Sequence, residues 1–235
     1  MNFVRTHCTN VIKQVAFAIL IVCSSANVNA QQEIHKIYKD SIRQLRSQKN
    51  FSPKDTLYID LLSNLGYHLR YYNSDSLFLL SNEALKLSKD AGYKEGESRA
   101  RLCLGDYYSD KGDADNAISN YTASLEIARE MGNKNLSLRI MNNLASENAY
   151  KGDYAHALTG YLNAIEIAEE VGDKNMLSIM NENIANLYAS QKDFEQSLDF
   201  YKKVEKINGE LGDEVIIAET LGNLASTYAD MGKLD

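Results

Sequence analysis

The chain has 235 residues, of which 44% are hydrophobic and only one is proline, and its formal net charge at pH 7 is -7. This composition, which has no Gly- or Ser-rich run, excludes a disordered chain and favours one rich in helix. The acidic balance disfavours binding to nucleic acids or anionic lipid surfaces, because both require clustered lysine and arginine side chains.

The first thirty residues have the three parts of a secretory signal peptide. Arg5 and Lys13 supply positive charge, residues 15–22 form a short apolar run, and residues 28–30 offer a small-residue cleavage site. We therefore expect cleavage near Ala30, which would export the mature chain to a periplasmic or other extracytoplasmic compartment.

Two other interpretations of this segment stay open. One is an uncleaved membrane anchor, although the apolar run is far shorter than the ~20 residues that a span needs. The other is a lipoprotein signal ending at Cys23, although Val22 stands where such a signal has a small residue. Removal of residues 1–30 would leave 23 basic and 32 acidic residues, a net charge of -9. Nothing after residue 30 resembles a transmembrane segment, so we expect no membrane contact by the mature segment itself.

Cleavage would also leave Cys103 as the only thiol of the mature chain, so that no intrachain disulfide can form. This cysteine lies within a helical pattern and has no histidine or second cysteine at a useful spacing. We expect a packed, unreactive side chain.

Two helical segments precede the regular part of the sequence. Residues 31–50 have apolar side chains at helical spacing and predict an N-terminal capping helix. Residues 51–92 predict a divergent helical hairpin. Its first helix is expected to begin at Ser52 and Pro53, an N-cap followed by a proline in the first turn, and to run to about Tyr72.

From residue 93 onward the sequence repeats itself every forty residues, in units 93–132, 133–172 and 173–212 and an incomplete unit 213–235. Small residues recur in two columns and a large aromatic residue in a third, and together these let two helices approach closely: Gly105, Ala145, Ala185 and Ala225; Ala117, Ala157 and Ser197; Tyr121, Tyr161 and Tyr201. Gly112 and Gly152 are expected to end the first helices, and Asp113, Asp153 and Asp193 to cap the second ones. The pattern predicts an all-α stack of antiparallel helical hairpins, each covering the apolar face of its neighbour.

The spacing of Leu104, Gly105 and Tyr108, followed by Gly112-Asp113 and by Ala117 and Tyr121, resembles the tetratricopeptide repeat. The resemblance covers about residues 53–235 and implies a right-handed α-solenoid. The chain departs from the family in its forty-residue period, against a usual period of about 34, and in lacking the proline that ends the second helix. It also lacks the family's tryptophan, whose column reads Arg101, Met141, Asn181 and Leu221. The longer period is similar to that of animal spindle-orientation adaptors and bacterial Rap-type regulators.

The resemblance implies that the first helices line a concave groove, where asparagine recurs at the forty-residue period. An amide has both a donor and an acceptor, so an asparagine ladder can pair with the backbone of an extended peptide. Two arginines near the starts of their helices can add contacts to a carboxylate. The residues expected to bind a protein or extended peptide are Asn142, Asn143, Asn183, Asn186, Asn223, Arg99 and Arg139. The alternative is that these amides form hydrogen bonds between helices.

No pattern of an enzyme or a cofactor site stands out. Motifs for phosphate-binding loops, zinc proteases and serine hydrolases do not occur, and His35, His68 and His156 share no ligand spacing, so we expect no metal site and exposed histidines. The carboxylate pairs Glu126/Glu130 and Glu166/Glu170 recur at the repeat period and are typical of a solvated outer face.

We therefore predict a partner-binding module that is not an enzyme. The signal peptide and the unfinished last repeat resemble the extracytoplasmic front of bacterial membrane-anchored signalling proteins, with an output domain of the histidine kinase, cyclase or transcriptional regulator type, and they predict a continuation beyond Asp235. A free periplasmic scaffold or assembly factor is the alternative. An enzyme with a site in the groove is a third reading.

Overall fold

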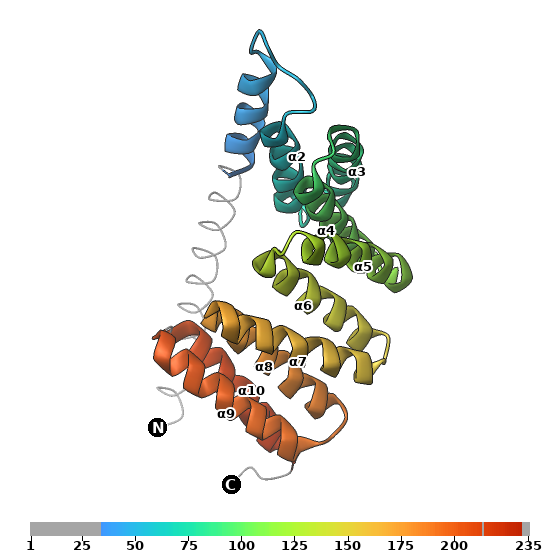
Figure 1. Ribbon diagram of the computed structural model, residues 1–235. Helices are drawn as coiled ribbons and strands as arrows, with labels where there is room; N and C mark the ends of the chain where they lie inside the picture. The colour runs from blue at the N-terminus through green and yellow to red at the C-terminus, as the bar shows by residue number, and fades with distance from the viewer. Residues whose placement is uncertain (1–33, 213, 232–235) are drawn as a thin grey trace, which may run out of the picture.

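The computed structural model describes residues 34–212 and 214–231, and in these ranges the chain is helical apart from its turns and contains no strand. Antiparallel helical hairpins follow one another in a curved stack (Figure 1). The predicted all-α solenoid is confirmed. The signal-peptide interpretation concerns residues 1–30, which lie outside the described residues.

The described chain begins with a helix at residues 34–46, which we call the N-terminal helix. Its successors alternate between first and second helices of the hairpins, and their bounds are α2 (Thr56–Leu69), α3 (Ser74–Ala91), α4 (Lys94–Asp110), α5 (Ala114–Glu130), α6 (Lys134–Tyr150), α7 (Tyr154–Val171), α8 (Lys174–Ser190), α9 (Phe194–Leu211) and α10 (Glu214–Asp230). Within the described ranges, no helix is long and apolar enough to span a bilayer.

The turn inside each regular hairpin forms as predicted. The side chains of Asp113, Asp153 and Asp193 each accept a hydrogen bond from the backbone N–H three residues further on, at the N-termini of α5, α7 and α9. The residue before each cap has a positive φ: 72° at Gly112, 82° at Gly152 and 63° at Lys192. Lys192 adopts the left-handed conformation despite its Cβ, because the turn geometry is common to all three hairpins.

The predicted start of the first hairpin is wrong. Helix α2 begins at Thr56 and not at Pro53, because Asp55 is its N-cap and accepts a hydrogen bond from the N–H of Leu57 at 2.9 Å. The Ser52 hydroxyl accepts a bond from the N–H of Lys54 instead, within a separate turn. The helix also ends earlier, at Leu69.

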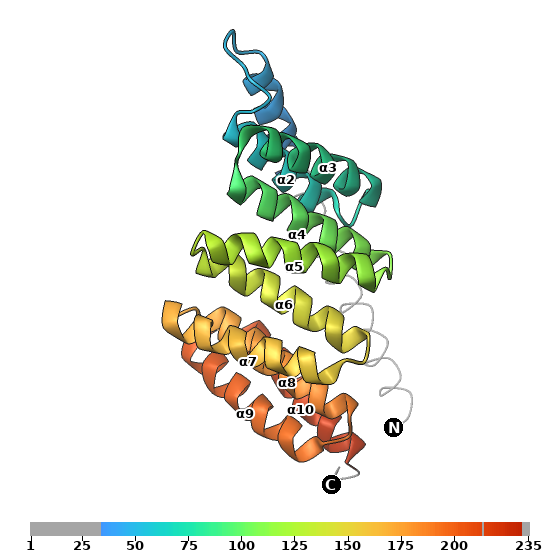
Figure 2. The same ribbon diagram turned by 45° about the vertical axis from the view of Figure 1, so that its right-hand side comes forward.

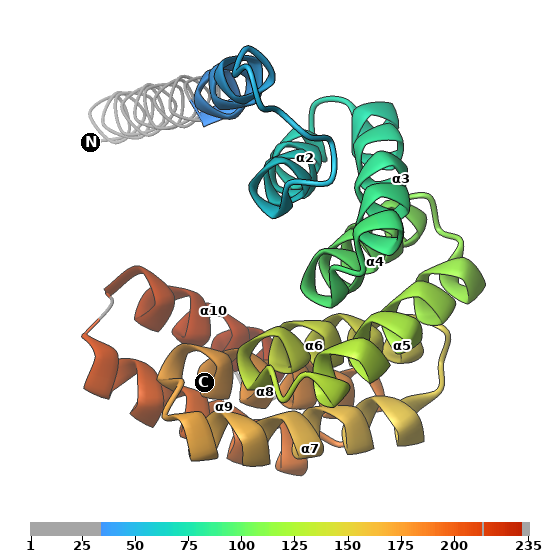
Figure 3. The same cartoon turned by 45° about the horizontal axis from the view of Figure 1, so that its top comes forward.

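Successive hairpins meet mainly where the second helix of one packs on the first helix of the next, α3 on α4, α5 on α6 and α7 on α8. Contacts also join the first helices directly, α2 with α4, α4 with α6, and α6 with α8. These helices form the inner face of the curve, and α3, α5, α7 and α9 lie on its outer side (Figure 3). The small column of the second helices is fully buried between paired helices, with Ala117, Ala157 and Ser197 all at 0% exposure. In the column of the first helices, Gly105, Ala145 and Ala185 are buried, whereas Ala225 of α10 is exposed, against the prediction. This arrangement follows from close helix contacts at small side chains.

The N-terminal helix packs on α2 at one end of the stack (Figure 2). Ile42 and Leu45 join the apolar cluster of the first hairpin. The expectation of exposed histidines is wrong here: the rings of His35 and His68 are half-buried, and Nε2 of His35 is 2.7 Å from the backbone oxygen of His68. His68 also stacks on Tyr38, so both imidazoles serve to join the two helices. His156 is exposed, as predicted.

Candidate functional site

The inner face of α2, α4 and α6 carries parallel columns of polar side chains. On α4, Arg99, Cys103 and Asp106 follow one another at about one helical turn, and on α6, Arg139 and Asn143 do the same. Because the first helices are in contact from hairpin to hairpin, these columns lie side by side.

The centre of this face is Asp106, a residue that is buried at 1% exposure. Its Oδ1 accepts hydrogen bonds from the Tyr121 hydroxyl at 2.8 Å and from Nδ2 of Asn143 at 2.9 Å. Nη1 of Arg70 lies 3.4 Å from the same oxygen. Burial raises the pKa of Asp106, and the Arg70 charge and the Tyr121 hydrogen bond oppose this rise.

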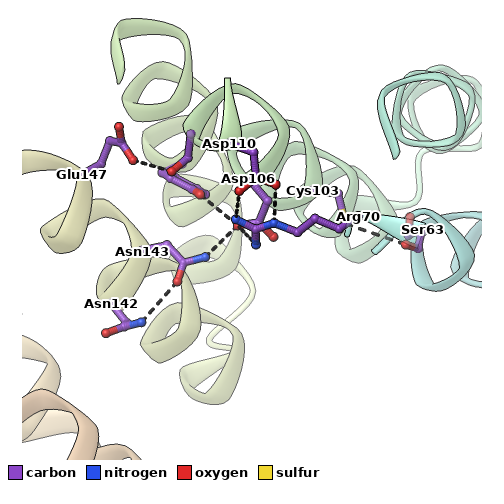
Figure 4. A network of polar contacts seen from close by, with 10 residues as sticks. Ser63, Arg70, Cys103, Asp106, Asp110, Asn142, Asn143 and Glu147 are labelled. Atoms are coloured by element: carbon purple, nitrogen blue, oxygen red, sulfur yellow. Dashed lines mark hydrogen bonds and ion pairs between the residues drawn. The ribbon is translucent and has the colours of Figure 1, made fainter. Parts of the chain in front are cut away.

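Arg70 supplies the countercharge from the neighbouring hairpin (Figure 4). Its Nε and Nη2 donate to the two carboxylate oxygens of Asp110, both at 2.6 Å, in a bidentate pair. Burial alone would lower the pKa of Arg70, but the hydrogen bonds to Asp110 and the charge of Asp106 raise it above its usual value. The guanidinium therefore stays charged and joins α2 to α4.

The predicted asparagine ladder is present as a chain of amides that bond to one another. Asn183 donates to Oδ1 of Asn142 at 2.8 Å, Asn142 donates to Oδ1 of Asn143 at 3.2 Å, and Asn143 donates to Asp106. Figure 4 shows the α6 part of this chain running towards Asp106 and Arg70. The alternative of hydrogen bonds between helices is thus realised for these amides, although each amide has a further N–H or lone pair to offer.

The other two predicted asparagines have local partners. Asn186 accepts a hydrogen bond from the Tyr201 hydroxyl of the same hairpin. Asn223 donates to Oε1 of Glu182 at 2.7 Å, which joins α10 to α8. Burial, followed by the nearby charge of Glu219, raises the pKa of Glu182, and the Asn223 bond opposes this. Neither asparagine belongs to the amide chain around Asp106.

The two predicted arginines meet at one cavity of about 200 Å³ between α2, α4 and α6. We call it the inner cavity, and it is lined by Ser63, Asn64, Tyr67, His68, Arg99, Leu102, Cys103 and Arg139. Arg99 is neutralised by Glu95, at 2.7 Å between Nη2 and Oε1. Arg139 forms no ion pair with any described residue, and its guanidinium lies 5.9 Å from the centre of the Tyr67 ring. A guanidinium that is not bonded to a carboxylate can receive an anionic group at such a cavity.

Cys103 is packed, as predicted. Its exposure is 6%, and its thiol lies 3.8 Å from the backbone oxygen of Ser63. Burial raises the pKa of the thiol to about 12, and the charge of Asp106 adds to this rise. The side chain is not poised for nucleophilic chemistry.

The predicted carboxylate pairs lie on the outer side of the stack, as expected. Glu126, Glu130, Glu166 and Glu170 are exposed on the outer helices, and Glu170 forms an ion pair with Lys134 of the neighbouring helix. In the described part of the chain, no group of three or more His, Cys, Asp or Glu side chains is placed to hold a metal ion.

Sequence reasoning found the arginines and asparagines but missed Arg70, Asp106 and Tyr67. A signal for Asp106 was present, since it directly follows Gly105 of a packing column and its register partners are Ser146 and Asn186. A carboxylate at a position that faces the partner helix needs a nearby donor or cation. The identity of that cation was not readable, because Arg70 lies in another hairpin.

Comparisons with known proteins agree with this architecture. Two family models described as tetratricopeptide repeat match the chain, one over residues 96–170 and the other over residues 180–210. No curated protein matches the sequence significantly.

Several solved structures are similar in fold. BtubC (BKLC) from P. vanneervenii superposes with a TM-score of 0.73 at 19% identity, covering 87% of this chain and 85% of that one. A signal transduction ATPase with numerous domains from Pyrococcus horikoshii, which has a tetratricopeptide repeat sensor, gives 0.70 at 15% identity, covering 85% of this chain and 32% of that one. A Rap protein complexed with competence and sporulation factor gives 0.67 at 14% identity, covering 82% and 58%. At these identities the likeness concerns the fold.

Proposed function

We propose that this chain, which is a tetratricopeptide-repeat protein, binds an extended peptide or protein segment along its inner face and is not an enzyme. The observation that carries this proposal is the inner cavity, where the guanidinium of Arg139 forms no ion pair with a described residue and only the more distant charge of Asp106 acts on it. A carboxylate of the bound segment would neutralise that charge, and a charge-assisted hydrogen bond of this kind contributes about 1.5–3 kcal/mol.

The amide chain next to the cavity supports the same proposal. Asn142, Asn143 and Asn183 are held in fixed orientations by their mutual hydrogen bonds. Amides that are already oriented lose little entropy on binding, and their remaining N–H and C=O groups can pair with a peptide backbone. The Rap protein bound to competence and sporulation factor is a structural neighbour, which favours a peptide over other ligands.

A substitution of Arg139 tests the proposal directly. The probes are fluorescein-labelled peptides of random sequence, selected for binding to the full chain, each prepared with free carboxylates and as the corresponding amides. We expect Arg139→Gln to lower the affinity for the carboxylate peptides by about tenfold or more, because one charge-assisted hydrogen bond is lost. The affinity for the amidated peptides should change little. Fluorescence anisotropy measures both affinities.

The matched control is Arg129→Gln, which removes the same charge from an exposed position on the outer helix α5. This variant should leave the affinities unchanged. If Arg139→Gln binds every selected peptide as well as the parent chain, the inner cavity is not the peptide site. Alanine at Asn142, Asn143 or Asn183 is a poorer test, because it also breaks contacts between hairpins.

We further propose that the chain is exported, and that it forms the extracytoplasmic partner-binding part of a membrane-anchored signalling protein. The charge, the apolar run and the small residues of positions 1–30 support export. A free periplasmic scaffold is the second candidate, and the two differ in whether the gene continues past Asp235 into an apolar segment of ~20 residues. Mass spectrometry of the chain recovered from the envelope would detect an N-terminus near Gln31 if the signal is cleaved.

A further inference from the structure

The outer side of the first hairpin has an apolar groove of about 380 Å³ between the N-terminal helix, α2 and α3. We call it the outer groove. Its floor consists of Ile42, Leu62, Leu65 and Leu80, and its rim of Lys39, Arg43, Arg46 and Glu83. It lies on a different face from the inner cavity and shares no residue with it.

One bank of the outer groove is basic. Lys39, Arg43 and Arg46 stand at positions i, i+4 and i+7 of the N-terminal helix, and therefore form a stripe about 10 Å long. Lys39 has no ion pair with a described residue, and Arg43 pairs only with exposed Asp40 of its own helix. Arg46 lies 3.8 Å from Glu83, the single acidic residue of the rim. The rim is thus positively charged on a chain whose net charge is -7.

A second apolar groove lies at the equivalent place further along the stack, and its rim has no excess of basic side chains. Residues 42, 80 and 83 of the outer groove correspond, three repeat periods later, to residues 162, 200 and 203, which line an apolar groove of about 420 Å³ over α7, α8 and α9. There Lys203 and Lys206 are matched in number by Glu169 and Glu210. An apolar groove therefore occurs at two equivalent places in the stack, whereas the basic side chains at its edge are contributed by the N-terminal helix.

We propose that the outer groove binds an amphipathic α-helix of a partner protein, with an apolar stripe on the groove floor and acidic side chains against the basic stripe. The groove is lined by side chains of helices, whose own backbone groups are already bonded, so an incoming segment must satisfy its backbone internally, as a helix does. Acidic residues spaced i, i+4 and i+7 on the partner match the spacing of Lys39, Arg43 and Arg46. This interaction does not depend on the peptide proposed for the inner face.

The test uses a designed helical peptide of roughly 18 residues, about five turns, with leucines on one face and glutamates spaced i, i+4 and i+7 on its flank. It is titrated into the full chain carrying 13C-labelled isoleucine and leucine methyl groups. We expect the methyl signals of Ile42, Leu62, Leu65 and Leu80 to shift. The double variant Lys39→Glu with Arg43→Glu should bind the peptide at least about tenfold more weakly, because both new carboxylates repel the glutamates of the peptide.

The matched variant is Lys203→Glu with Lys206→Glu, which makes the same change of charge at the second groove and should leave the affinity unchanged. A peptide with glutamine in place of glutamate should bind weakly to every variant. The proposal is overturned if the glutamine peptide binds equally well, or if the shifts occur at other methyl groups. It is also overturned if the chain does not bind the peptide but sediments with phosphatidylglycerol vesicles, and if the double variant of Lys39 and Arg43 loses this sedimentation. That result would assign the basic stripe to lipid headgroups.

Discussion

The hairpins α4–α5 and α8–α9 have a tyrosine at the same place, but its hydroxyl bonds to a carboxylate in the first and to an amide in the second. In both, a buried tyrosine of the second helix reaches a polar side chain of the first: Tyr121 donates to Asp106, and Tyr201 to Asn186. Asn186 is exposed and has a partner only within its hairpin, whereas Asp106 is buried and bonded to two neighbouring hairpins. The intervening hairpin uses a third group, since the Tyr161 hydroxyl is hydrogen-bonded to Ser146 at 2.8 Å.

The difference shows how a single buried carboxylate can link three successive hairpins of a repeat array. A neutral polar residue beside the tyrosine satisfies the hydroxyl without needing a partner from another hairpin. A carboxylate at the same position must be compensated when it is buried, and Arg70 and Asn143 supply this compensation from the hairpins on either side. The inner cavity lies beside Asp106, so the same hydrogen bonds and ion pairs position the side chains that line it.

The largest expected effect concerns Cys103, which occupies in α4 the column that holds Asn143 and Asn183 in the later hairpins. In a chain with Cys8→Ser and Cys23→Ser, reaction of the remaining thiol with a disulfide reagent at pH 8 should be at least about a thousandfold slower than in urea. The reason is that burial raises its pKa to about 12 and also blocks access. Stopped-flow absorbance measures the rates. A fast reaction of the native protein would mean that α4 opens locally and exposes the thiol.

Asp106→Ala should destabilise the protein by roughly 3 kcal/mol. It leaves the buried Tyr121 hydroxyl without its hydrogen-bond acceptor and removes one of the two carboxylates that compensate the charge of Arg70. The equivalent Asn186→Ala should cost about 1 kcal/mol, since only one hydrogen bond at an exposed position is lost. Urea denaturation followed by circular dichroism compares the two. Equal costs would contradict the special role of the carboxylate.

Gly105→Ala should cost about 2 kcal/mol, because a Cβ at this position would lie 2.4 Å from Cε1 of Tyr121. Ala185→Gly, at the same place in α8, should cost about 1 kcal/mol through helix propensity alone. In the double variant Gly105→Ala with Tyr121→Leu the two costs should not add, because the smaller side chain relieves the overlap. Additive costs would show that Gly105 is not needed for the approach of the tyrosine.

The sequence was most informative where structure depends on near neighbours. The capping aspartates, the glycine turns and the small packing columns other than Ala225 were predicted correctly, because they rely on contacts within one hairpin and recur every forty residues. The start of α2 was missed, since Ser52-Pro53 and Asp55 are both acceptable N-caps and only packing selects between them.

The candidate site was predicted in part. Arg99 and Arg139 were expected to act together, and the structure places both at the inner cavity. Asn143, Asn183 and Asn223 recur every forty residues and were expected to form one ladder, but Asn223 has its partner elsewhere. Its spacing is the same as that of the other two, so periodicity alone did not separate it from them.

What the sequence determined by itself is the repeating hairpin, because helix ends, caps and close helix contacts are set by residues a few positions apart or one period apart. What the tertiary structure decided is which polar groups meet. The partners of Asp106 come from three other helices, α2, α5 and α6, and the basic bank faces an apolar floor only because the N-terminal helix packs on α2. Such contacts depend on the curvature of the stack, which is fixed by the packing of whole helices.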